Sequence, residues 1–206
     1  GTMPANTNID VKDETTCISG GAFFDCSGLT SIIIPNSVTS INDYTFSGCS
    51  SLTSITIPEN LTSIGYRAFA GCSSLTSITI PISITNFGKE VFEECSSLHT
   101  VCWNAKYCSS FASNYDYDKP FYHIASQITS FTFGDSVEYI PSHLCCRMSS
   151  LTSIAIPNSV TSIGGYAFAY CSSLTSIAIP CNVTSVDKTI FYGCTSLASV
   201  VWNAKT

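Results

Sequence analysis

The residues of this sequence best suited to chemistry are its 12 cysteines, six of which recur at one position of a repeating pattern. A row of thiols can in principle hold metal ions or exchange electrons. The pattern supplies only one cysteine per repeat, contains no C-x-x-C pair, and replaces the cysteine once by Met148. We therefore interpret the row as small buried hydrophobic side chains, with no metal and no cofactor. The row consists of Cys26, Cys49, Cys72, Cys95, Cys171 and Cys194.

Two further features could carry covalent chemistry. Cys102 and Cys108 flank the segment WNAKY, and the sequence leaves open whether they form a disulfide. Asn60 and Asn182 begin N-L-T and N-V-T, which match the acceptor pattern for N-glycosylation. Both asparagines occupy the same position of the repeat, so we expect them to face the backbone of a neighbouring repeat instead. The other cysteines outside the row are Cys17, Cys145, Cys146 and Cys181.

Nothing in the sequence indicates an active site. The three histidines, His99, His123 and His143, share no spacing with each other or with a nucleophile. The G-x-S-x-G, H-E-x-x-H, phosphate-loop and dinucleotide motifs do not occur. The short run DYD at Asp116 is too short for a calcium-binding loop. We therefore predict that the protein is not an enzyme.

The elements that position these residues are repeats of 23 residues. The hexapeptide SSLTSI starts at Ser50, Ser73, Ser149 and Ser172. A fixed period of this size is typical of a solenoid. Counting from the leucine of the hexapeptide, the first residue of each repeat is Leu29, Leu52, Leu75, Leu98, Ile128, Leu151, Leu174 and Leu197, with one step of 30 residues between Leu98 and Ile128.

Within one repeat, each apolar residue has a predicted place in the core. Leu52, Ile55 and Ile57 have the L-x-x-L-x-L spacing of a leucine-rich repeat strand, so they should point inward. Leu61 and Ile64 should do the same from a second short strand, and Gly65 should permit a turn. Ala68, Phe69 and Cys72 should fill the next corner and close the coil. A single coil cannot offset the entropy of ordering its own residues, so stability belongs to the stack.

The unit CSSLTSITIPENLTSIGYRAF, from Cys49 to Phe69, resembles the BspA-like leucine-rich repeat family, and its copies extend the resemblance over residues 15–206. The resemblance implies a repeat solenoid of 23-residue coils with a parallel β-sheet, mostly β with short helical turns. It also implies a protein without catalysis, secreted or displayed at a cell surface, with a role in adhesion.

The charge and the apolar content of the sequence limit the classes of partner that the protein can bind. The formal net charge is −6, with 8 Lys and Arg against 14 Asp and Glu. Phosphate backbones require clustered cations, so we exclude nucleic acid. No apolar run approaches the roughly 18 residues that would span a bilayer, so we expect no membrane insertion in this segment.

The chain should divide into two parts. We interpret residues 1–14 as a tag scar and polar lead-in, and residues 15–206 as one solenoid. The coil over 98–127 is enlarged by seven residues. It begins with WNAK at Trp103, and the same letters recur at Trp202, which suggests that the array is truncated at its C-terminus. Because Trp103 follows a strand position and recurs as Trp202, we assign Trp103 to packing.

Positions that vary between otherwise constant neighbours should be exposed. In the enlarged coil, Tyr115, Asp116, Tyr117 and Asp118 lie in a turn-like run and are the first candidates for a binding surface. In the unit G-x-x-A-F-x-x-C, the variable positions include Tyr66, Tyr166 and Tyr170, which form the second candidate surface.

Two functions remain open from the sequence. The first is a binding module that engages a protein or glycan partner at a host or neighbouring-cell surface. The second is a structural spacer that projects other domains from a cell surface. A binding module should gather its exposed aromatic residues into a patch, whereas a spacer should scatter them.

Overall fold

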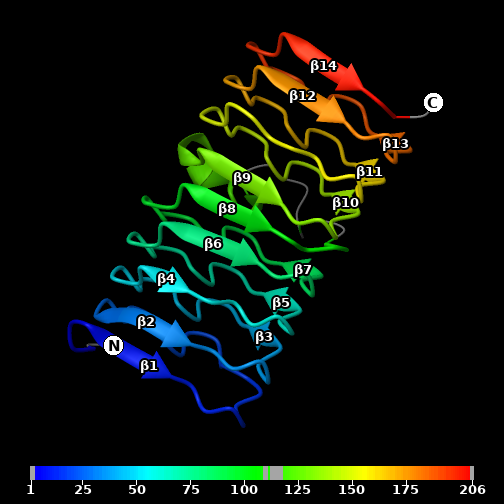
Figure 1. The fold of residues 1–206 in the computed structure, drawn as a ribbon. Coiled ribbons are helices and arrows are strands. Elements are labelled where there is room, and N and C mark those ends of the chain that lie inside the picture. The colour runs from blue at the N-terminus through cyan, green and yellow to red at the C-terminus, as the bar shows by residue number, and fades with distance from the viewer. Residues whose placement is uncertain (1–2, 109–110, 112–117, 205–206) are drawn as a thin grey trace.

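The computed structural model describes residues 3–108, 111 and 118–204, and these form a stack of coils that rises from the N-terminus to the C-terminus (Figure 1). Each coil runs along one long side, turns, and returns through a shorter extended segment. The strands on the long side are β1 (Thr7–Asp10), β2 (Leu29–Ile33), β4 (Ser54–Ile55), β6 (Ser77–Ile80), β8 (Thr100–Trp103), β9 (Ser130–Phe133), β12 (Ser176–Ile179) and β14 (Ser199–Trp202). The short strands are β3 (Ser40–Ile41), β5 (Ser63–Ile64), β7 (Asn86–Phe87), β10 (Tyr139–Ile140), β11 (Ser162–Ile163) and β13 (Ser185–Val186).

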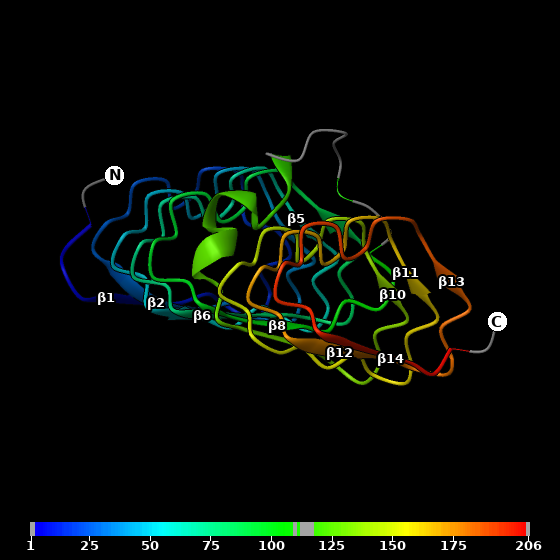
Figure 2. The ribbon, with the colours of Figure 1, turned by 90° about the horizontal axis from the view of Figure 1, so that it is seen from above.

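All strand pairs are parallel and join equivalent residues of consecutive coils. Ser31 pairs with Ser54 in the long sheet, and Ser40 pairs with Ser63 in the short one. The long side carries the sheets β1-β2-β4, β6-β8-β9 and β12-β14, while the short strands form β3-β5-β7 and β10-β11-β13. Viewed along the stack, the two sets of strands occupy separate edges of each coil (Figure 2). The predicted solenoid of 23-residue coils is confirmed.

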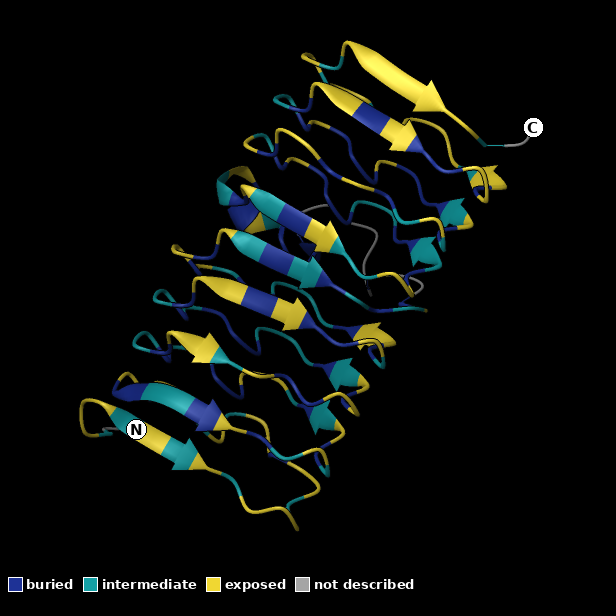
Figure 3. Ribbon diagram, in the orientation of Figure 1, coloured by how far each residue is buried: buried dark blue, intermediate teal, exposed yellow. Residues whose placement is uncertain are grey.

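The core occupies the inside of the stack, as the alternating burial along the strands shows (Figure 3). The first residue of every coil from Leu29 to Leu174 is at most 1% exposed. Leu61, Ala68, Phe69 and Cys72 have no exposed surface, as predicted. Ile55 is an exception to the predicted inward face, because it is only partly buried.

Phenylalanine rings stack on one another through the N-terminal half of the core. The centroids of Phe46 and Phe69 are 5.4 Å apart, and those of Phe69 and Phe92 are 5.7 Å apart, with nearly parallel planes. Phe23 extends this phenylalanine ladder at one end. At the other end the enlarged coil supplies Phe121, 5.2 Å from Phe92, although the period is broken there. The ladder therefore extends into the enlarged coil.

The N-terminal end of the stack differs from the sequence prediction. Residues 7–10 form β1, which pairs with β2, so the sheet begins inside the segment that we expected to be a lead-in. Trp103 is completely buried, whereas Trp202 is 47% exposed at the same strand position. The assignment of Trp103 to packing is confirmed, whereas Trp202 is exposed because no described coil lies over β14.

The enlarged coil contains the 3-10 helix η2 (Tyr122–Gln127). Gln127 ties this helix to the preceding turn, because its side-chain amide donates to the carbonyl oxygens of Cys95 and Leu98 at 2.7 and 2.8 Å. The helix therefore places Tyr122 and His123 at the corner of the coil, beside the corner of the coil that follows.

Candidate binding site

The corner that follows each short strand has an unusual backbone. Two residues per coil adopt a left-handed conformation there, although most of them carry side chains. This conformation turns the chain sharply and leaves the side chains at the rim of the stack. The first such position holds Tyr44, Arg67, Glu90, His143, Tyr166 and Thr189, and the second holds Gly48, Gly71, Glu94, Arg147, Tyr170 and Gly193. Glycines at these corners, three of them at the second position, are the sequence signal that could have revealed this backbone.

One aromatic cluster lies at these corners in the first coils, and we call it the N-terminal rim (Phe24, Tyr44, Tyr66). The ring centroids of Tyr44 and Tyr66 are 5.2 Å apart, edge to face. The Tyr66 hydroxyl donates to Glu90 at 3.2 Å, and the Arg67 guanidinium lies 5.4 Å from the Tyr66 ring centre. Partial removal from water and a hydrogen bond with Tyr44 raise the pKa of Tyr66 to about 12. Tyr66 is therefore already engaged by its own neighbours.

A second cluster, the C-terminal rim (Tyr166, Tyr170, Tyr192), is more open. These side chains are 39%, 40% and 56% exposed. Tyr192 meets both other rings edge to face, at 6.4 Å from Tyr166 and 5.3 Å from Tyr170. His143 stacks on Tyr166 at 5.0 Å. Removal from water is the main reason why the pKa of Tyr170 is raised, and the nearby Tyr192 raises it further. The rim thus joins the corners of two consecutive coils, and His143 extends the contact to the coil before them.

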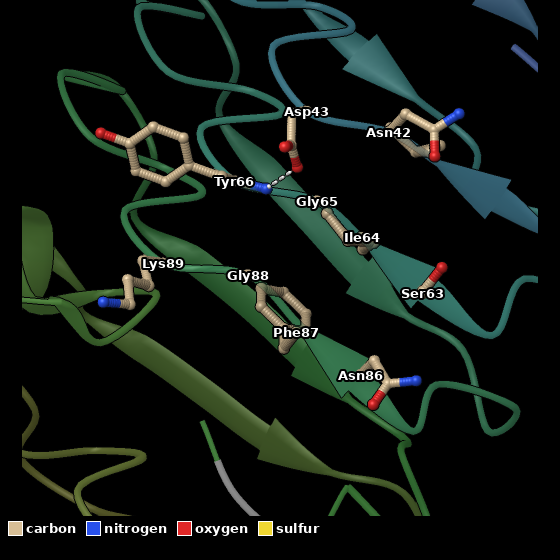
Figure 4. Close-up of a pocket in the computed structure, with 11 residues that line it drawn as sticks. Asn42, Asp43, Ser63, Ile64, Gly65, Tyr66, Asn86, Phe87, Gly88 and Lys89 are labelled. Atoms are coloured by element: carbon tan, nitrogen blue, oxygen red, sulfur yellow. Dashed lines mark hydrogen bonds between the residues drawn. The ribbon is translucent and has the colours of Figure 1, made fainter. Parts of the chain in front are cut away.

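Beside the short sheet β3-β5-β7 lies a groove of about 430 Å³, which we call the glycine groove (Figure 4). Its floor includes Gly65 and Gly88, and its wall includes Asp43, which accepts a hydrogen bond from the Tyr66 amide at 2.7 Å. Gly65 does not have the left-handed backbone of a glycine turn. A side chain there would come within 2.5 Å of the Asp43 backbone, so close approach between coils is what requires glycine.

Of the first predicted binding surface, in the enlarged coil, the structure describes only one residue. Tyr115, Asp116 and Tyr117 lie outside the described residues. Asp118 is described and is 6% exposed, which contradicts its predicted exposure. Its carboxylate accepts an ion pair from Lys89 at 3.0 Å, and its carbonyl oxygen accepts the Glu90 amide at 3.3 Å. Asp118 thus fastens the enlarged coil to the preceding one.

The cysteine row is a structural ladder. Each of its thiols from Cys49 onward, taken in the described coils, donates to a carbonyl oxygen 26 residues earlier at 3.0–3.2 Å. No disulfide joins any cysteine of the described residues, so Cys102 and Cys108 are separate thiols here. In the same part of the chain, no three His, Cys, Asp or Glu side chains gather as a metal site would require.

The two possible glycosylation asparagines face neighbouring backbone, as predicted. Asn60 donates its side-chain amide to the carbonyl oxygen of Asn36 at 3.2 Å, and Asn182 donates to Asn158 at 2.8 Å. Ser37, Ser83 and Ser159 occupy the same repeat position and donate to the preceding coil in the same way. In these five coils the position therefore serves stacking.

Comparison with known proteins gives one family and several related structures. The model of the BspA type Leucine rich repeat region matches residues 5–115 and 117–206 in six copies. A leucine-rich repeat protein from Bacteroides ovatus is 31% identical with a TM-score of 0.56, covering 96% of this chain. The chain spans only 55% of the length of that protein. A search of curated proteins finds no match.

Two more distant structures are also similar. A leucine-rich repeat protein from Eubacterium ventriosum is 19% identical with a TM-score of 0.42, over 94% of this chain and 72% of that one. The leucine-rich repeat protein of T. pallidum is 22% identical with a TM-score of 0.36, over 94% of this chain and 68% of that one.

Proposed function

The chain belongs to the BspA-type leucine-rich repeat family, and from this premise we propose that it is a non-catalytic binding module that engages a protein or glycan partner through the C-terminal rim. The partner belongs to a host or neighbouring-cell surface, and the module is secreted or displayed at a cell surface. Within the described residues, no helix has the length and apolar character needed to cross a membrane.

The observation that carries the proposal is the clustering of exposed tyrosines. Tyr166, Tyr170 and Tyr192 come from two consecutive corners and contact one another, instead of being scattered over the stack. Tyrosine suits an interface because it offers a large, rigid area with few rotatable bonds, and its hydroxyl can still form hydrogen bonds. The N-terminal rim is a weaker candidate because Tyr66 already forms a hydrogen bond with Glu90 and a cation–π contact with Arg67. Tyr115, Asp116 and Tyr117 stay predicted contributors from outside the described residues.

The test is adhesion with matched surface variants. Beads coated with the protein are applied to fixed epithelial cells, some of them treated with protease and others with periodate. The rim variant Tyr166→Ser with Tyr192→Ser should lower retention about tenfold or more, because a few aromatic residues dominate most interfaces. The control variant is Ile33→Ser with Val201→Ser, which removes two hydrophobic side chains that are 64% and 51% exposed away from the rim.

The treatments identify the partner. Loss of retention after protease indicates a protein, and loss after periodate indicates a glycan. If beads coated with the wild type, the rim variant and the control variant are all retained equally, the rim is not the binding site. If none is retained above uncoated beads, a structural spacer is the better description of this segment.

A further inference from the structure

The two arginines of the described chain have opposite surroundings. Arg67 forms ion pairs with Glu90 at 2.6 Å and Glu93 at 2.5 Å, so its charge is neutralised by two carboxylates of the following coil. Arg147 forms no ion pair with a carboxylate among the described residues, and its side chain is exposed. In a protein with a net charge of −6, a guanidinium without an acidic partner needs an explanation.

Aromatic rings hold the Arg147 guanidinium in place. It lies over the Tyr122 ring at 5.3 Å and over the Tyr170 ring at 5.1 Å, with one tyrosine from the preceding coil and the other from the following coil. Contacts of this kind use the faces of the guanidinium plane. Its N–H donors lie at the edges of that plane and point in fixed directions. Where the guanidinium stacks with its face on a ring, these donors are left for a ligand.

A hollow of about 430 Å³ lies beside this arginine. Its lining includes Tyr122, His123, Ser126, Ser149 and Tyr170 in addition to Arg147. These residues offer hydroxyl groups, an imidazole and the flat surfaces of two rings, and no acidic residue is among the described residues that line the hollow. The volume falls in the range of roughly 300–1,000 Å³ usual for small-ligand sites.

We propose that this hollow, the Arg147 pocket, binds the carboxylate of an acidic sugar, such as a uronic acid or a sialic acid. The carboxylate accepts two parallel hydrogen bonds from the guanidinium edge, the geometry in which arginine binds carboxylates most strongly. The apolar C–H face of the sugar packs on Tyr122 or Tyr170, and the hydroxyls of Ser126 and Ser149 meet those of the sugar. The proposal rests on the proposed function as a binding module and specifies its ligand.

The sharpest test uses two ligands that differ only in the acid. Methyl glucuronide and methyl glucoside are titrated separately into the whole protein, and binding is followed by backbone amide NMR shifts and by calorimetry. The glucuronide should bind at least about tenfold more tightly, because a charge-assisted bidentate pair is lost in the glucoside. Shifts should concentrate at 122–126 and 147–149. Sialyllactose should bind in the same place if the natural source is the end of a glycan chain.

Variants then assign the binding to Arg147. Arg147→Lys keeps the charge but removes the planar fork, so glucuronide affinity should fall about tenfold or more. Arg67→Lys is the matched control and should leave that affinity unchanged. The melting temperature of each variant is measured to show that the fold persists.

Several outcomes would overturn the proposal. The first is equal affinity for glucuronide and glucoside. The second is equal affinity for acetate or phosphate, which would indicate a general anion site. The third is an unchanged affinity in Arg147→Lys. The fourth is a sulfated or acidic peptide that binds more tightly than any sugar. The adhesion test uses Tyr166 and Tyr192, which lie outside this pocket, so the binding module can stand even if its acidic ligand is refuted.

Discussion

The thiol of Cys72 donates a hydrogen bond to the carbonyl oxygen of Phe46 at 3.2 Å, from one coil to the coil before it. The same oxygen accepts the amide of Cys49 at 3.1 Å. The ring of Phe46 lies in the phenylalanine ladder, so the contact links the two buried columns of the stack. Repetition of this contact explains why a cysteine recurs in the repeat without forming disulfides.

Thiol reactivity should follow this arrangement. With iodoacetamide at pH 8, Cys17 and Cys181 should be alkylated first because both are exposed. Cys49, Cys72 and Cys95 should react far more slowly, because they are buried and burial raises their pKa values. Mass mapping over time checks the order. Rapid labelling of the ladder in folded protein, or disulfides within it, would contradict the packing interpretation.

Stability should fall at alkaline pH. Desolvation raises the pKa of Cys95 and of Cys171 from 9.0 to about 12. Between these values the unfolded chain has lost the thiol proton while the folded chain retains it, so rising pH favours unfolding. Full stability should persist below about pH 9 and then decline towards pH 12, by up to roughly 4 kcal/mol for one such thiol.

Urea unfolding measured from pH 7 to pH 11 checks this dependence. Cys171→Ala should be less stable at neutral pH but should lose less stability as the pH rises. Cys181→Ser, which changes an exposed thiol, should follow the wild-type curve. A Cys171→Ala curve parallel to the wild type would show that ladder thiols do not control the alkaline transition.

Loss of one ring from the phenylalanine ladder should weaken the stack locally. Phe69 has no exposed surface and stacks on Phe46 and Phe92, so Phe69→Ala should cost roughly 3–5 kcal/mol. Hydrogen exchange should quicken most in the coils over 52–97. Phe24→Ala is the control, because that ring is 45% exposed. Unchanged exchange over 52–97 would contradict the assigned core.

A substitution at Gly88 tests whether close approach between coils is the reason for glycine before the corner. An alanine Cβ at Gly88 would lie 2.4 Å from the backbone carbonyl carbon of Gly65, so Gly88→Ala should cost roughly 1–3 kcal/mol. Gly134→Ala should cost less, because its first contact is the end of the Asn104 side chain, which can move. Equal melting temperatures for the two variants would show that the coils can separate to admit a side chain.

The period of the sequence by itself determined the coil, its inward face and the buried thiols. A residue at a constant repeat position lies next to its own copies in the stack, so the burial of one copy predicts the burial of the others. Leu52, Phe69 and Cys72 are buried for this reason. The same logic predicted that Asn60 would bond to a neighbouring coil.

Tertiary structure decided what happens where the period breaks or where two coils approach. The enlarged coil places Phe121 in the ladder, buries Asp118 against Lys89, and brings Tyr122 over Arg147. None of these residues is at the repeat distance from its partner, so no pattern in the sequence relates them. Contacts across the insertion depend on the path of the chain in space, and that path is set by packing between coils and not by the local sequence.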